Sequence, residues 1–153
     1  MTNAREYGII VVEIRKGATT MTTINLPTIE RMYKNNGQEA ERIFRFAVSG
    51  ELCKADNIRH DLGTDCGEYQ VKSARATVCR GTDIEAYVAT EVATKFAYVN
   101  ADFTTAYIMN KDEYIAFATK FGTVTTESAK NGGHRKVRLK AEGTEMREWL
   151  ARA

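Results

Sequence analysis

Apolar and polar positions along the chain follow two different periods, and the first clear one predicts a helix. Over residues 38–48 the apolar side chains recur at i, i+3, i+4, i+7 and i+8, which places them on one helical face. Gly50 follows as the expected C-cap. A shorter helical pattern over residues 27–35 ends at an Asn-Asn-Gly sequence, where we expect that helix to stop.

The period then changes to two, which is typical of strands. Residues 58–62 and 68–73 flank a Gly-rich turn at 63–67, so this region predicts a β-hairpin. Successive side chains of a strand point to opposite faces. Tyr69 and Val71 should therefore pack against a helix, while the residues between them face the other way.

The C-terminal half predicts further helices and strands. Capping boxes at residues 82–85 and 110–113 indicate helix starts, and aromatic and β-branched residues indicate strands. The expected elements are a helix over 82–93, strands over 96–99 and 105–109, a helix from Asn110 to Phe121, a strand over 137–139 and a helix over 144–151. This order predicts an α/β fold with a mixed central sheet flanked by helices.

Composition fits one folded domain. The 153 residues are 43% hydrophobic and 27% charged, and 22 Lys and Arg against 20 Asp and Glu give a net charge of +2. We expect a single domain over residues 21–153, with residues 1–20 as a leader or an edge strand. The longest apolar run, residues 8–12, is far shorter than the roughly 20 residues of a membrane span, so no membrane partner is expected.

Cysteine usage indicates the cellular compartment. Cys53, Cys66 and Cys79 are odd in number, form no CxxC pair and follow no signal peptide. We therefore expect reduced thiols in a cytoplasmic protein. The alternative is a zinc site that also recruits His60, although these spacings match no common zinc motif.

The polar face of the predicted hairpin carries candidate chemistry. Glu68, Gln70 and Lys72 share one face of the second strand, and Asp61 lies on the neighbouring strand. Carboxylate and amide oxygens bind hard divalent cations, and an ammonium group orients a water or a phosphate. This combination predicts a site for Mg²⁺ and an anionic substrate. The alternative is the solvated face of an edge strand.

These residues resemble the signature of the PD-(D/E)xK nuclease superfamily, over residues 38 to about 100. Lys72 matches the family's lysine, Gln70 its second acidic position and Asp61 its first Asp, with Asp65 as the alternative to Asp61. The carboxylate of the preceding helix is matched by Glu41 or Glu39.

The resemblance implies a restriction endonuclease-like core that hydrolyses DNA with Mg²⁺ or Mn²⁺, and a size that suits a homodimer. Two departures stand out, because no Pro precedes Asp61 and the neutral Gln70 replaces a carboxylate. Gln70 should lower the affinity for metal, and Glu68 is placed to supply the missing charge.

A basic segment near the C-terminus predicts contact with a nucleic acid backbone. Residues 130–140 contain five Lys or Arg, one His and no acid around a Gly-Gly pair. The candidate contacts are Lys130, His134, Arg135, Lys136, Arg138 and Lys140. A solvated hairpin with Val137 and Leu139 facing inward is the alternative.

Two functions follow from these patterns. The first is a metal-dependent DNA endonuclease in which Asp61, Gln70 and Glu68 hold the metal, and Lys72 and Glu41 assist catalysis. The second is a catalytically inactive nucleic-acid-binding or protein-interaction module on the same fold.

Overall fold

The computed structural model describes residues 21–49 and 69–152. The elements in chain order are β1 (Thr22–Asn25), α1 (Asn36–Ser49), β2 (Tyr69–Ser73), β3 (Thr77–Arg80), α2 (Ile84–Thr90), β4 (Lys95–Val99), β5 (Thr105–Asn110), α3 (Lys111–Phe121), β6 (Gly122–Thr126), the 3₁₀ helix η2 (Ala129–Asn131), β7 (Arg135–Leu139) and α4 (Thr144–Arg152). Within these ranges, none of the helices combines the length and the apolar character that crossing a membrane requires.

The strands form two sheets. Sheet A is mixed, with the order β1-β5-β4-β2; β2 runs parallel to β4 and the other pairs are antiparallel. Sheet B is antiparallel, with the order β3-β7-β6. The predicted α/β class is confirmed, but the single sheet divides in two. A tight turn with Arg75 at φ 68° follows β2 and directs the chain into sheet B.

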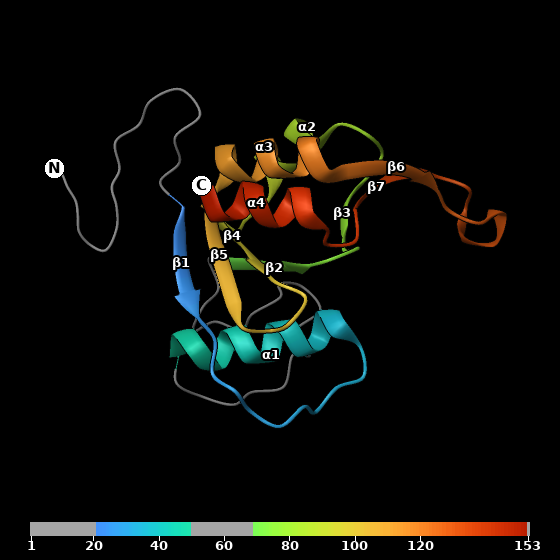
Figure 1. Cartoon of the computed structure of the whole chain (residues 1–153). Coiled ribbons are helices and arrows are strands. Elements are labelled where there is room, and N and C mark those ends of the chain that lie inside the picture. The colour runs from blue at the N-terminus through green and yellow to red at the C-terminus, as the bar shows by residue number, and fades with distance from the viewer. Residues whose placement is uncertain (1–20, 50–68, 153) are drawn as a thin grey trace, which may run out of the picture.

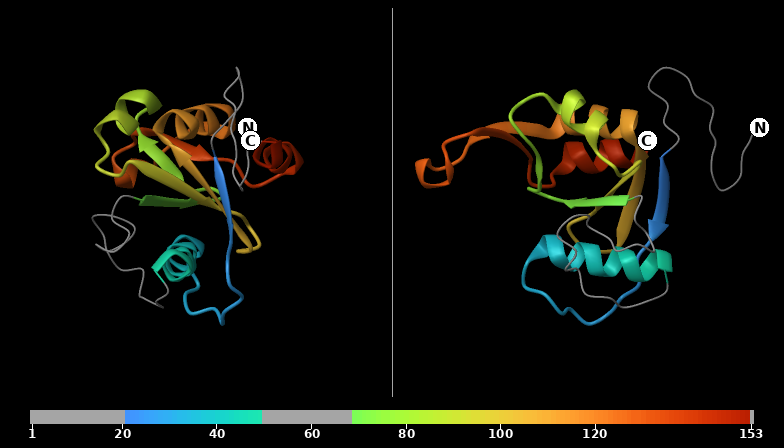
Figure 2. Two further views of the ribbon diagram at one scale, coloured as in Figure 1. Left: turned by 90° about the vertical axis from the view of Figure 1, so that its left-hand side faces the viewer. Right: turned by 180° about the vertical axis from the view of Figure 1, so that it is seen from behind.

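Sheet A lies between two layers (Figures 1 and 2). Helix α1 covers one face, and α2, α3 and α4 lie on the other side together with sheet B. Strand β4 is buried on both faces, and its side chains alternate between two apolar clusters. Phe96 and Tyr98 pack with α3, and the Phe96 ring stacks on Tyr114 with centroids 4.1 Å apart. Ala97 and Val99 pack with α1.

The helices with the clearest patterns form as predicted. In α1 the apolar face is buried at Ala40, Ile43 and Phe44, and it becomes exposed at Val48. The expected capping box begins α3. Asn110 Oδ1 accepts the main-chain N–H of Glu113 at 2.7 Å, and Glu113 Oε1 accepts the main-chain N–H of Asn110 at 2.8 Å. Helix α4 buries Met146 and Leu150 and places Trp149 against two rings of α3.

The segment 27–35 is not helical, so the helix predicted there is wrong. The main-chain N–H groups of Met32 and Tyr33 donate to Glu39 Oε1, at 3.2 and 2.9 Å, instead of to helical carbonyls. Asn35, expected to end a helix, starts one. Its side chain accepts the main-chain N–H three residues on at 2.9 Å, which is the geometry of an N-cap.

Two other boundaries differ from the prediction. Asp83, and not Thr82, caps α2, because the Asp83 side chain accepts the main-chain N–H of Ala86 at 3.0 Å. The helix ends at Thr90 rather than at residue 93, since the chain becomes extended at Glu91. Strands β1, β3 and β6 were not predicted from the hydrophobic pattern.

Several predicted features lie outside the described residues. These are residues 1–20, the first hairpin strand, Gly50, Cys53, His60, Asp61, Asp65, Cys66 and Glu68. Cys79 is described, and it is a free, buried thiol whose pKa is raised by burial. The described ranges contain no cluster of three or more His, Cys, Asp or Glu suited to a metal ion.

Candidate functional site

Strand β2 separates polar from apolar side chains, as predicted. The Tyr69 ring meets Phe44 of α1 edge-on, with centroids 5.2 Å apart, and Val71 is buried in the same apolar cluster. Gln70 and Lys72 therefore project from the opposite face of the strand. In the described part of sheet A, β2 is a terminal strand, so this polar pair lies near the sheet edge.

Lys72 lies where the two sheets meet. Its Nζ donates a hydrogen bond to the main-chain carbonyl of Thr77 at 2.9 Å, across the turn that joins β2 to β3. Thr77 is the first residue of β3 and lines a pocket on sheet B. The ammonium group of the candidate catalytic lysine is thus held beside that pocket.

The described part of the chain does not place the predicted acidic partners beside Gln70 and Lys72. Asp61, Asp65 and Glu68 lie outside the described ranges. Glu41 lies on α1, the helix that covers the Tyr69 face of β2, whereas Gln70 and Lys72 leave the other face. The structure places Gln70 and Lys72 together, and their combination with Asp61, Glu68 and Glu41 stays a prediction.

Glu39, the alternative to Glu41, has a structural position. Its side chain is 1% exposed, and its Oε2 lies 2.8 Å from Nη2 of Arg42, which is 2% exposed. Burial raises the pKa of Glu39, but the hydrogen bonds from Arg42, Tyr33 and Met32 together outweigh it and hold the pKa below its ordinary value. The carboxylate therefore ties α1 to the segment before it.

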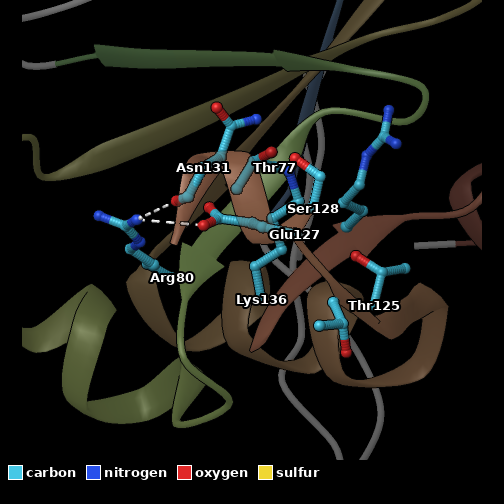
Figure 3. A pocket seen from close by; sticks show the side chains of 9 residues that line it. Thr77, Arg80, Thr125, Glu127, Ser128, Asn131 and Lys136 are labelled. Atoms are coloured by element: carbon cyan, nitrogen blue, oxygen red, sulfur yellow. Dashed lines mark hydrogen bonds and ion pairs between the residues drawn. The ribbon is translucent and has the colours of Figure 1, made fainter. Parts of the chain in front are cut away.

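The outer face of sheet B carries basic side chains in cross-strand rows. Arg80, Lys136 and Thr125 form one row, because Lys136 of β7 is paired with the other two. Arg138 lies in the next row, beside Thr77. The hollow they form, here called the basic pocket, has a volume of about 750 Å³ (Figure 3). It is lined by Thr77, Arg80, Thr125, Thr126, Glu127, Ser128, Asn131, Lys136 and Arg138.

The predicted basic segment contributes to this face as the alternation indicated. Val137 and Leu139 are buried, whereas Arg138 and Lys140 are exposed and Lys136 is half-buried. The other predicted contacts, Lys130, His134 and Arg135, are exposed at the end of the β6–β7 hairpin. At this end, consecutive glycines adopt positive φ of 105° and 68°, a conformation that other residues rarely take.

Arg80 and Glu127 form an ion pair in the pocket that was not predicted from the sequence. Arg80 Nη2 lies 3.0 Å from Glu127 Oε1 and 3.3 Å from the main-chain carbonyl of Asn131. The Arg80 hydrogen bond, together with the positive charges of Arg80 and Lys136, holds the pKa of Glu127 below its ordinary value. No local motif marks this pair, because the two residues are 47 positions apart and meet only through the pairing of β7 with both β3 and β6.

Comparison with protein-family models, curated proteins and solved structures finds no match to this chain, so its function has to be argued from the geometry of Gln70, Lys72 and the basic pocket.

Proposed function

We propose that the chain is a metal-dependent nuclease that hydrolyses phosphodiester bonds of DNA. One observation carries the proposal. Gln70 and Lys72 share a face of β2, and the Lys72 ammonium contacts Thr77, which lines the basic pocket. A catalytic amine and cations suited to phosphates therefore lie next to each other. The chain order supports the same proposal, since β2 runs parallel to β4 with α2 between them in sequence.

The donor set of the proposed site fits a hard divalent cation. The amide oxygen of Gln70 would be joined by the carboxylates of Asp61 and Glu68, and oxygen donors of this kind suit Mg²⁺ and Mn²⁺. When bound, the metal would supply charge neutralisation and an acidified water at neutral pH. Of these three residues, only Gln70 lies within the described ranges.

The chain's own residues have separate tasks in this proposal. Lys72 would orient the attacking water as an ammonium or accept its proton as the neutral amine, and a general base of this kind contributes roughly 10²- to 10⁴-fold in rate. Glu41 would add a carboxylate from α1 around the edge of β2. The cations of the basic pocket would hold the DNA backbone through phosphate contacts, which position a strand without reading its sequence.

Cleavage of supercoiled plasmid tests the proposal. Lys72→Met keeps the aliphatic stem of the side chain and removes the ammonium. Lys34→Met makes the same change at an exposed lysine in the segment before α1. We expect the wild type and Lys34→Met to nick plasmid with Mg²⁺ or Mn²⁺ and to stop in EDTA. Lys72→Met should cut at least about 100-fold more slowly. Thermal melts of all three proteins check that they are folded.

Two results would contradict the nuclease. The wild type leaves plasmid intact with both metals, or Lys72→Met cuts as fast as Lys34→Met. The first result favours the second candidate, a module that binds nucleic acid without cleaving it. Two observations favour that candidate too: Gln70 carries no charge, and the Lys72 ammonium already bonds the Thr77 carbonyl. Retention of DNA by a protein that cleaves with neither metal would establish it.

A further inference from the structure

The basic pocket contains an internal ion pair with unequal burial. The Arg80 side chain is 60% exposed, whereas Glu127 is 14% exposed. The guanidinium of Arg80 on β3 therefore pairs with a carboxylate that is more buried than itself, and Figure 3 shows the two side chains beside each other. An exposed arginine has five N–H donors in a planar fork, so it can exchange one anionic partner for another with little rearrangement.

The chemistry of the pocket favours a phosphate group. Arg80, Lys136 and Arg138 bring three positive charges against the one carboxylate of Glu127, which leaves an excess suited to an anion. Thr77 and the hydroxyl-bearing residues of β6 add neutral hydrogen-bond donors. The residues that line this pocket include no aromatic side chain, so they suit contacts to a backbone and not stacking of bases.

Arg138 is anchored beside the pocket by the turn that follows β2. Its Nε donates to the main-chain carbonyl of Arg75 at 3.0 Å, and the remaining donors of the guanidinium can face a ligand. This bond fixes one cation in place before a ligand arrives, which lowers the entropy cost of binding. Arg80 is also held before a ligand arrives, but its partner is the carboxylate of Glu127, which a phosphate can replace.

We propose that the basic pocket binds a phosphate group of a nucleic acid strand, and that Glu127 is an internal competitor which the phosphate displaces from Arg80. The identity of the polymer is taken from the proposed function, but cleavage of that polymer is not required. Glu127 then lowers the affinity for nucleic acid and keeps Arg80 paired when no strand is bound. Contacts made by side chains other than Glu127 supply the attraction.

Fluorescence anisotropy with a labelled DNA duplex and a labelled single strand, both in EDTA, tests this role. Glu127→Gln removes the competing charge and should tighten binding about five-fold, the effect of one unit charge about 4 Å away in a water-like dielectric. Glu148→Gln makes the same change at an exposed site on α4 and should have a much smaller effect. Arg80→Ala should weaken binding about ten-fold, and Arg147→Ala is its control on α4.

The outcomes separate the competitor role from a structural one. If Glu127 only supports the hairpin, Glu127→Gln binds DNA no more tightly than the wild type, and the proposal is overturned. An equal gain in Glu148→Gln also overturns it, because net charge then explains the effect. A pocket for a free phosphate ion would bind inorganic phosphate while all four substitutions leave DNA binding unchanged, which is a third contrary result.

Failure of the nuclease proposal does not affect this test, since binding is measured without a divalent metal. A protein that never cleaves DNA still gives the expected order of affinities if the pocket binds phosphate. Thermal melts show whether Arg80→Ala is folded. If Arg80→Ala is unfolded, Glu127→Gln alone decides the test, because unfolding of the pocket cannot produce a gain in affinity.

Discussion

Substituting alanine for Glu39 removes a carboxylate that several donors share inside the protein. Its oxygens accept the main-chain N–H groups of Met32 and Tyr33 and the guanidinium of Arg42. After the substitution, water can replace the carboxylate at the N–H groups, because the segment that carries them lies at the surface. Water cannot do so readily at Arg42, which is buried.

The uncompensated charge of Arg42 sets the size of the effect. Breaking a buried ion pair by removing one partner costs about 3–5 kcal/mol of unfolding free energy. We expect a value near the lower end, about 3 kcal/mol, since Arg42 keeps its hydrogen bond to the main-chain carbonyl of Glu30. Replacing Glu39 and Arg42 together by leucine should cost less than Glu39→Ala alone, because no buried charge is then left without a partner.

Urea unfolding followed by far-UV circular dichroism measures these values. Glu148→Ala on α4 is the matched control, since its carboxylate is exposed, and it should change stability by less than about 0.5 kcal/mol. The reasoning fails if Glu39→Ala costs no more than Glu148→Ala. It also fails if the double leucine substitution costs as much unfolding free energy as Glu39→Leu and Arg42→Leu added together, because the two side chains would then not interact.

The same pair predicts a pH dependence. The pKa of Glu39 is lower in the folded protein than in the unfolded chain, so its stabilisation is complete above the unfolded value of about 4.3. It is lost as the pH falls through the folded pKa. Stability of the wild type should therefore fall more steeply below about pH 4 than that of Glu39→Gln. Equal slopes for the two proteins would count against the assigned pair.

Three further substitutions test other contacts. Gly122→Ala should lower the free energy of unfolding by about 1–3 kcal/mol, because the new Cβ would collide with a main-chain carbonyl of α3. Gly143→Ala places its Cβ in open space and should lower it far less, so equal urea midpoints for the two variants would refute the collision. The buried Tyr98 hydroxyl lies 2.8 Å from the Glu142 carboxylate, and Glu142→Ala would leave it unpaired. We expect Glu142→Ala to lower the free energy of unfolding by about 1–3 kcal/mol, and adding Tyr98→Phe to recover part of that loss. Gln70→Glu should lower the Mg²⁺ concentration for half-maximal plasmid cleavage about ten-fold by restoring a charge, and an unchanged metal dependence would contradict its role as a ligand.

The sequence predicts the elements whose signals are local. Helix α1 follows from its apolar spacing, and α3 follows from a capping box whose two hydrogen bonds both form. The strands that escaped prediction are four or five residues long, and β1 and β6 are rich in threonine. Strand β6 leaves Val124 47% exposed, so it has no apolar alternation to detect. The helix expected over 27–35 fails for the opposite reason, because Glu39 bonds the main-chain groups that would have formed it.

In the candidate site, too, only the features that depend on local sequence could be predicted. The facing of Gln70 and Lys72 was predictable, since alternation along one strand decides it. The hydrogen bond from Lys72 to Thr77 was not, because it depends on a turn that transfers the chain from sheet A to sheet B. Arg80 was missed because only the pairing of β3 with β7 brings it to the pocket.

The connection between β2 and β3 imposes a constraint on how this protein can change over evolution. Residues 74–76 link the strand that carries Lys72 to the strand that carries Arg80. Inserting one residue there would exchange the two faces of β3 and move the Thr77 carbonyl away from Lys72. Related chains that keep both cations should therefore keep this connection at constant length. An insertion at the exposed end of the β6–β7 hairpin would instead leave the strand pairing intact and shift only the Asn131 side of the pocket, where a carbonyl bonds Arg80.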